Sequence, residues 1–227
     1  MTRRHRLPLA LLTLTGVTGV IDAVSFLGPG HVFTANMTGN VVLLGFAAAG
    51  TPGLSVARSA LSLVAFLVGA AAGGRLGYSM AGRRRRRWLL TAGLGEAALL
   101  GAAALASVGM AGAGEAATGR IHSVIALTAV AMGLRNATIR RLAVPDLTTT
   151  VLTLTLAGIA AESSLAGGDN ARFGRRLLSV AAMFAGALIG ALLLHQGLAL
   201  PLTFSAICVL AATCIAASVW PPAAANH

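Results

Sequence analysis

Eight apolar runs, separated by short stretches that hold most of the arginines, fill nearly all of this 227-residue chain. Charged residues make up 10% of the chain and hydrophobic residues 56%, whereas a water-soluble domain has about a quarter of its residues charged. The sequence therefore predicts an all-α, polytopic integral membrane helix bundle and excludes a soluble enzyme or a disulfide-stapled secreted domain. The runs cover about 7–27, 32–50, 57–80, 88–110, 121–141, 147–162, 177–196 and 200–220.

The eight runs differ in how well they suit the hydrocarbon core, which a helix of about 20 apolar residues can cross. The third, fourth, seventh and eighth are long and apolar. The first and fifth contain charged or amide side chains, and the second and sixth contain clusters of asparagine or threonine. The polar runs thus form two pairs, first with second and fifth with sixth.

This pairing indicates an internal repeat. Residues 61–73 and 178–190 share six of thirteen positions, and a weaker match at an offset of 114 pairs Asp22 with Asn136 and Thr34 with Thr148. We therefore predict one membrane domain, 1–227, built from a first repeat over 7–112 and a second over 119–220. Each repeat is expected to hold three spans and one partial or re-entrant helix.

The arginines predict how the repeats are oriented. If one run of each polar pair fails to cross, fifteen of the seventeen arginines fall on the side of the N-terminus, and Arg58 and Arg120 fall on the other. If all eight runs crossed, the arginines would divide eight to nine. The positive-inside rule favours the first arrangement, which makes the repeats inverted and both termini cytoplasmic, in an inner or plasma membrane. Seven or eight spans remain the alternatives.

Two stretches resemble a known family. TGVTGVIDAVSFLGPGHVFTANMTGNVVLLG, residues 15–45, is similar to the signature stretch of the YoaK-like family of bacterial multi-span membrane proteins. GLRNATIRRLAVPDLTTTVLTLTLAG, residues 133–158, resembles that family's second characteristic stretch. The family has no known function, so the resemblance implies a multi-span membrane protein and supplies no substrate, cofactor or catalytic residue.

Ionisable side chains inside the runs are the first candidates for a functional site, because each costs a few kcal/mol in a membrane. Asp22 is the acid of the first run and Glu96 lies well inside the fourth. A proton or cation site at Asp22 is the functional hypothesis, and a capping or solvated acid near the end of a span is the structural one. Arg135 and Asn136 occupy the corresponding place in the second half, so we hypothesise an Asp22–Arg135 pair.

A second candidate is the polar patch formed by Asn36, Thr38 and Asn40. It follows Gly28-Pro29-Gly30, which cannot continue a helix. Backbone that leaves a helix within the membrane must find other hydrogen-bond partners, and amide and hydroxyl side chains supply them. The patch therefore predicts a cavity lining for a small solute, with interhelical hydrogen bonding as the alternative; Pro145-Asp146 and Thr148–Thr150 take its place in the second half.

Small residues four apart mark the third and seventh runs. They give each helix a smooth strip that permits close approach of another backbone. We expect the two strips to face each other where these helices cross, and homodimerisation through the strips is the alternative. The glycines concerned are Gly69, Gly73, Gly186 and Gly190.

Charge and motif content narrow the function further. The net charge is +11 and every basic residue is arginine, but the arginines flank apolar runs, so they indicate topology and contact with a lipid bilayer instead of a nucleic-acid partner. No metal-ligand spacing, phosphate loop or dinucleotide motif occurs, so we expect no metal and no cofactor. A transporter or channel for a small solute or ion is the leading hypothesis. The alternatives are a membrane-embedded enzyme acting on a lipid-type substrate and a non-catalytic assembly partner.

Overall fold

Helices form every regular element in the described part of the chain, which is residues 3–28, 30–80, 85–109, 115–142, 152–170 and 172–219 of this computed structural model. No strand occurs in these ranges, so the all-α prediction is confirmed. In chain order the helices are α1 (Arg3–Leu27), α2 (Met37–Ala48), α3 (Val56–Ser79), α4 (Arg85–Ser107), α5 (Glu115–Leu142), α6 (Leu152–Ala161), the short 3-10 helix η1 (Ser164–Ala166), α7 (Phe173–Leu194) and α8 (Ala199–Ala217).

Six of the described helices are long and apolar enough to cross a membrane: α1, α3, α4, α5, α7 and α8. Their apolar stretches hold 19–26 residues, or about 28–39 Å of helix, and a bilayer's hydrocarbon core is about 30 Å thick. α2 and α6 have 12 and 10 residues, which is too short to cross. The predicted division into six spans and two partial helices is therefore confirmed.

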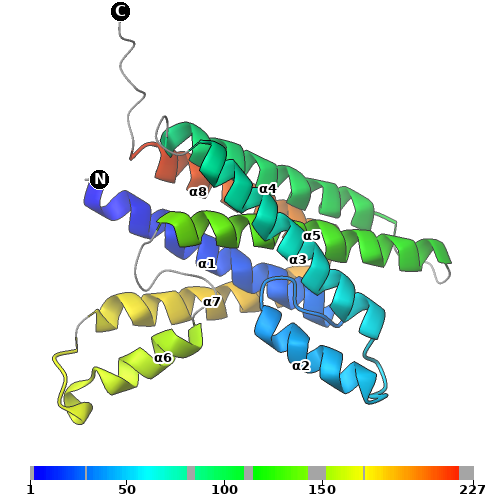
Figure 1. The fold of residues 1–227 in the computed structure, drawn as a ribbon, viewed down its shortest axis with the longest axis horizontal. Helices are drawn as coiled ribbons and strands as arrows, with labels where there is room; N and C mark the ends of the chain where they lie inside the picture. Colours follow the sequence, from blue (N-terminus) through cyan, green and yellow to red (C-terminus); the bar gives the residue numbers. More distant parts are fainter. Residues whose placement is uncertain are drawn as a thin grey trace, which may run out of the picture.

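Successive long helices run in alternating directions, and the short helices α2 and α6 lie at opposite ends of the bundle (Figure 1). The start of α1 lies beside the end of α8, where Arg6 Nη1 donates a hydrogen bond to Ser218 Oγ at 3.1 Å. At the same end, the guanidinium of Arg141 lies 4.2 Å from the centre of the Tyr78 ring and Arg85 reaches the Leu142 carbonyl. We call this the arginine-rich end.

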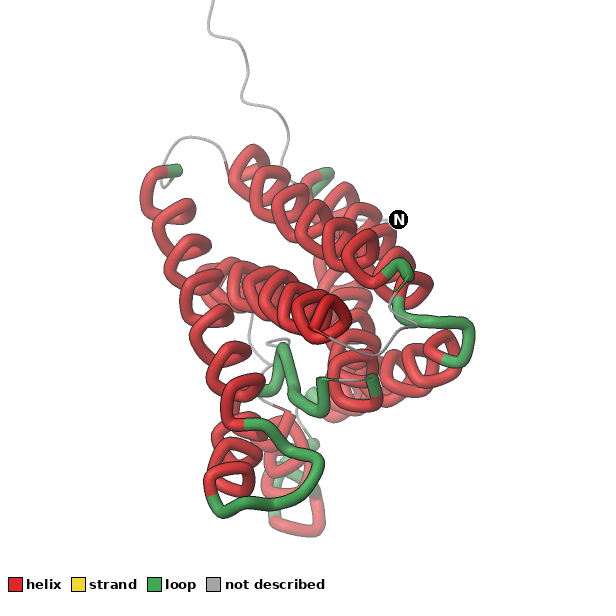
Figure 2. Tube along the Cα trace, turned by 90° about the vertical axis from the view of Figure 1, so that its right-hand side faces the viewer, coloured by secondary structure: helices red, strands yellow, loops and turns green. Residues whose placement is uncertain are grey.

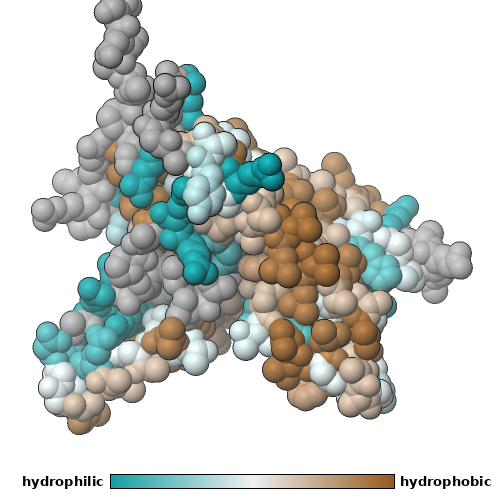
Figure 3. Space-filling view, viewed as in Figure 1, coloured by the Kyte–Doolittle hydropathy of each residue, from teal (hydrophilic) through white to brown (hydrophobic). Residues whose placement is uncertain are grey.

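The outer surface of the bundle carries large apolar side chains. Val64 and Leu67 on α3 and Phe184 and Leu188 on α7 are each more than half exposed. Figure 3 shows the apolar surface as a brown area over α3 and α2, with more polar surface toward both ends of the bundle. Such a belt between polar ends is the surface that a membrane-spanning protein presents to a lipid bilayer.

The glycine strips are contact surfaces, but not between the helices we expected. α3 packs along α5 and α7 packs along α1, and α3 and α7 do not touch within the described residues. A methyl group on Gly69 would lie 2.8 Å from Cα of Val130, and one on Gly186 would lie 2.9 Å from Cα of Gly16. The predicted crossing of the third and seventh helices is therefore wrong: each strip faces the first helix of the other half.

The two packings use corresponding residues. A methyl group on Gly133 of α5 would lie 2.7 Å from the Ala70 nitrogen of α3, and one on Gly19 of α1 would lie 2.7 Å from the Ala187 nitrogen of α7. Gly19 and Gly133 are 114 positions apart, and Ala70 and Ala187 are 117 apart. The backbones approach so closely because small residues stand on both helices of each pair.

A non-helical segment, residues 31–36, enters the bundle between α1 and α2. Figure 2 shows this loop surrounded by helices. Its residues Val32, Thr34 and Ala35 are at most 2% exposed. Asn40 holds the segment, because its side chain accepts a hydrogen bond from the Phe33 nitrogen at 2.9 Å. The counterpart expected in the second half, with Pro145-Asp146 and Thr148–Thr150, lies outside the described residues.

Candidate functional site

α1 turns a line of polar side chains toward the interior of the bundle. Thr15, Thr18, Asp22 and Ser25 recur every three or four residues, a spacing that places side chains on one helix face. Each is at most 9% exposed. The hydroxyls of Thr15 and Thr18 donate to carbonyl oxygens one turn earlier, at 3.0 Å. The line thus satisfies part of its own hydrogen bonding and leaves hydroxyl oxygens and a carboxylate for partners on other elements.

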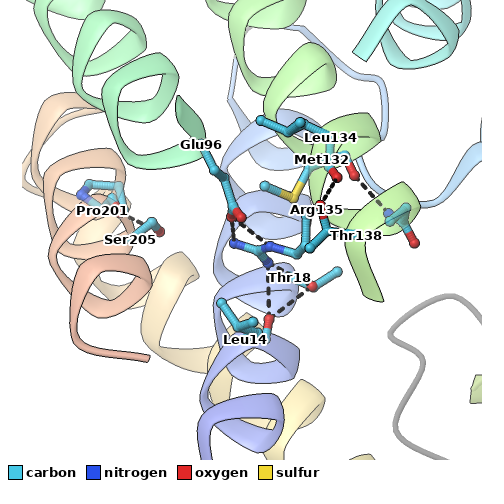
Figure 4. Close-up of polar contacts among 10 residues, drawn as sticks. Leu14, Thr18, Glu96, Met132, Leu134, Arg135, Thr138, Pro201 and Ser205 are labelled. Carbon is cyan, nitrogen blue, oxygen red and sulfur yellow. Dashed lines mark hydrogen bonds and ion pairs between the residues drawn. The ribbon is translucent and has the colours of Figure 1, made fainter. Parts of the chain in front are cut away.

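Arg135 of α5 meets this line and Glu96 of α4. Its Nε donates to Glu96 Oε1 at 2.6 Å, and its Nη2 is ion-paired with the same oxygen. Its Nη1 donates to the Leu14 carbonyl and to Thr18 Oγ1, both at 3.0 Å. Figure 4 shows the guanidinium between α4 and α1. One side chain therefore links three membrane-spanning helices.

The pair is buried as well as bonded: Arg135 is 2% and Glu96 is 4% exposed. Two charges removed from water lose hydration, so such a pair is weak evidence for stability by itself. Removing one partner leaves the other charge uncompensated, which costs about 3–5 kcal/mol. Ionisable residues kept in this way inside a membrane most often belong to functional sites.

The hypothesised pair of Asp22 with Arg135 is not formed, because Arg135 takes Glu96 as its partner. An Asp22 carboxylate oxygen instead accepts a hydrogen bond from the backbone nitrogen of Ala35, at 3.1 Å. Asp22 therefore anchors the buried loop to α1. Asn136, next to Arg135, donates to the Met132 carbonyl of its own helix at 2.9 Å.

The three residues of the polar patch have separate positions. Asn36 is the N-cap of α2, and its side chain accepts from the Gly39 nitrogen at 3.3 Å. Thr38 is exposed on the first turn of α2. Asn40 is buried, and its amide donates to Ser62 Oγ at 2.9 Å in addition to its contacts with the loop. The structure therefore does not bring the patch together with Glu96 and Arg135.

A cavity lies beside the ion pair, between α1, α4, α5 and α8. We call it the Glu96 cavity; it leaves about 40 Å³ for the centres of water-sized molecules. Its polar lining residues are Glu96, Arg135, Thr138 and Thr213, and its other walls are mainly leucine and alanine. Of its lining residues on α4 and α5, Glu96 and Arg135 lie farthest from the arginine-rich end, so they form its deep end.

A second cavity lies nearer the opposite end of the same helices. This Ser25 cavity leaves about 20 Å³ for the centres of water-sized molecules. It is lined by Ser25 and Thr128 and otherwise by apolar residues and glycine, which come from α1, α5, the loop after α1 and the loop before α8. On α1 the linings of the two cavities are separated by the seven positions from Leu14 to Ile21, or about 10 Å of helix. The interval contains buried apolar side chains, among them Val17.

Sequence reasoning identified Glu96 and Arg135 but missed the threonines around them. Thr18 belongs to the three- and four-residue spacing of Thr15, Asp22 and Ser25, so its place on the inner face of α1 was readable from the sequence. Thr213 had no such signal, because a lone hydroxyl in an apolar run has many structural roles. Its position depends on how α8 packs against α4.

Comparison with known proteins places this bundle in a family. A family model described as "Protein of unknown function (DUF1275)" matches residues 10–217, from within α1 to the last residue of α8. The chain belongs to the DUF1275 family. The family description assigns no activity.

One curated relative of this DUF1275 chain is the UPF0700 transmembrane protein YoaK of Bacillus subtilis (strain 168). It is 33% identical over 156 residues, which are 69% of this chain and 66% of that protein. The chain thus covers just under two thirds of the relative's length. No solved structure matches the chain. This relative is a transmembrane protein by name, which agrees with the six long apolar helices of a multi-pass membrane protein. The resemblance to YoaK-like proteins is therefore confirmed.

Proposed function

We propose that this protein moves a small solute or ion across the membrane, with the Glu96–Arg135 pair at its binding site. One observation carries the proposal: a buried ion pair forms the deep end of a cavity in the bundle interior. An ion pair with only a structural role could lie at the surface, without a cavity beside it. An apolar core would avoid the free-energy cost of burying both charges. A charged group beside room for a small molecule is the expected arrangement of an intramembrane binding site.

The two cavities define the path. Both are lined by α1, α5 and the region of α8, and the interval between them holds buried apolar side chains such as Val17, Leu100 and Met132. A solute in the Glu96 cavity is thus separated from the Ser25 cavity by about 10 Å of packed side chains, which are mostly apolar but include Thr15 and Thr18 on α1. Opening this packing while the other end closes would give alternating access, as in carriers built from repeats.

The proposal includes the organisation into two repeats, the first over 7–112 and the second over 119–220, which are inverted relative to each other. Its support is the reciprocal packing: Gly69 packs against α5 and Gly186 against α1, and an added Cβ would lie 2.8 and 2.9 Å, respectively, from a facing Cα atom. One helix of each half therefore packs along the first helix of the other half. Glu96 and Arg135 also come from different halves. The positive-inside rule places the arginine-rich end in the cytoplasm. Both termini are then on the cytoplasmic side of the cell membrane, and the Glu96 cavity faces the cytoplasm.

The remaining candidates take supporting roles in this proposal. Asp22 and Asn40 hold the loop of residues 31–36 by its backbone, so they position a segment that covers the interior of the bundle. Asn36 caps α2, Thr38 is exposed on the first turn of that helix, and Asn136 donates a hydrogen bond within α5. The solute site is assigned to Glu96 and Arg135, together with Thr138 and Thr213.

Solute entry into proteoliposomes tests the proposal. The purified protein is placed in phosphatidylethanolamine–phosphatidylglycerol vesicles, and stopped-flow light scattering follows swelling in glycerol, urea, sodium chloride, potassium formate and potassium nitrate, with valinomycin in the potassium arms. We expect at least one solute to enter faster than in protein-free vesicles and Arg135→Met to remove that increase. Glu162→Gln, which alters the separate ion pair with Arg176, should retain it. The absence of accelerated entry for every solute would refute transport.

A further inference from the structure

The Arg135 guanidinium is already arranged to hold an anion, and Glu96 occupies that place. Its Nε and Nη2 both face the Glu96 carboxylate, while Nη1 is taken by the Leu14 carbonyl and Thr18. The Nε–Nη2 edge is the one that binds carboxylates and other planar oxyanions through two parallel hydrogen bonds. Nη1, fixed to α1, holds this edge toward the Glu96 cavity.

Charge then restricts what can bind. An anion added to the intact pair would place two negative charges and one positive charge in a site of low dielectric constant, which is costly. A proton on Glu96 removes this excess, because the neutral acid no longer needs the guanidinium. The charges of Glu96 and Arg135 sum to zero before binding, and the sum stays zero when one monovalent anion and one proton bind together.

The other ionisable groups around the pair do not change this balance. From α1, Asp22 interacts electrostatically with Arg135. When its carboxyl group is ionised, it further disfavours an anion that arrives without a proton. α8 contributes no ionisable side chain but its two cysteines. On α3, Arg75 is exposed, and the arginines of α4 itself lie at the arginine-rich end.

The cavity and its mouth favour a small anion. The Glu96 cavity leaves about 40 Å³ for the centres of water-sized molecules, which suits a solute of a few non-hydrogen atoms. Leu7 and Leu142 line the cavity toward the arginine-rich end, where Arg6 binds Ser218 and Arg85 reaches the Leu142 carbonyl. A positively charged entrance raises the local concentration of anions.

We propose that the Glu96 cavity binds a small monovalent oxyanion of the formate or nitrate class together with one proton. A proton taken up from the buffered solution bonds to a Glu96 carboxylate oxygen, the ion pair with Arg135 breaks, and the oxyanion accepts hydrogen bonds from Nε–H and Nη2–H of Arg135. No bond within the anion changes and no net charge enters the site. This inference rests on the proposed function, since it names the ligand class of the same site.

The test measures binding without flux, so it can fail separately from transport. Calorimetric titration of the detergent-purified protein with potassium formate and potassium nitrate, in two buffers of different ionisation enthalpy, counts the protons taken up. We expect about one proton per anion, and an affinity that falls about tenfold per pH unit where Glu96 is ionised. Glu96→Gln, which resembles the neutral acid, should bind with no proton uptake and no such pH dependence.

Controls separate the site from the fold. Glu162→Gln should keep the wild-type proton count and pH dependence, and Arg135→Lys and Arg135→Met should lose at least tenfold in affinity, with size-exclusion profiles reporting folding. Three results would each overturn the proposal: no binding of either anion by folded wild-type protein, binding without proton uptake, or unchanged pH dependence in Glu96→Gln. If binding is found without flux, the ligand assignment stands and transport fails.

Discussion

A single added methyl group at the α3–α5 crossing gives a sharp test of how the halves interlock. In Gly69→Ala the new Cβ would lie 2.8 Å from Cα of Val130, whereas ordinary contacts begin at 3.4 Å. The two backbones must therefore separate by more than half an ångström or distort. Overpacking of this kind costs about 1–3 kcal/mol, and the gain from replacing a helical glycine by alanine is about 0.5–1 kcal/mol.

Gly74→Ala in the same helix is the matched control, because a Cβ there meets no atom within 4 Å. Gly74→Ala gains the helix stabilisation of alanine over glycine without a steric clash. The free energies of unfolding of the two variants should therefore differ by the overpacking cost, about 1–3 kcal/mol. Equilibrium unfolding in mixed micelles with increasing SDS measures this difference.

The same experiment on the second half extends the test. Gly186→Ala should lose about as much as Gly69→Ala, since its Cβ would meet Cα of Gly16 at 2.9 Å. Gly174→Ala, whose Cβ meets nothing within 4 Å, is the matched control in α7. If Gly69→Ala and Gly74→Ala unfold at the same SDS fraction, the close approach of α3 to α5 is refuted.

Three further predictions concern topology and the buried loop. In a variant without the two native cysteines, Leu165→Cys should be protected from an impermeant thiol reagent in intact cells and Thr51→Cys should react; the reverse pattern would contradict a cytoplasmic arginine-rich end. Asn40→Leu should destabilise by several kcal/mol, because buried loop groups lose their partner at about 1–3 kcal/mol each, while Ser62→Ala should lose about 1 kcal/mol; equal losses in SDS unfolding would remove Asn40 as the anchor. Asp22→Asn keeps an oxygen that can accept from the loop backbone, so it should be at least about 1 kcal/mol more stable than Asp22→Leu in the same assay.

Local chemistry explains why much of the fold was predictable. Runs of about 20 apolar residues have one stable form in a membrane, the helix, because the backbone must satisfy its own hydrogen bonds there. α1 ends at Leu27, directly before the Gly28-Pro29-Gly30 stretch at which the sequence predicted a break. The helix of residues 115–142 continues through Arg135 and Asn136, although these polar residues interrupt its apolar pattern, because side-chain polarity does not break a helix whose charges find partners.

The candidate site was predictable in its members and not in their pairing. A buried acid and a buried arginine inside spans are costly wherever they lie, so the sequence marked Asp22, Glu96 and Arg135. The sequence offset between the halves favoured Asp22 as the partner of Arg135. In the structure Asp22 is engaged by the loop at Ala35, and α4 brings Glu96 to the guanidinium instead.

A membrane bundle of six long and two short helices follows from the apolar runs, and the same runs contain the small residues at which the helices pack. Which helices those residues join could be seen only in the folded bundle: Gly69 and Gly186 face α5 and α1, not each other. A strip of small residues fits any smooth backbone equally well, so it specifies a close contact and not the partner. The partner is decided by the packing of all the helices together, and that packing also places Glu96, Arg135 and Thr18 in one cluster.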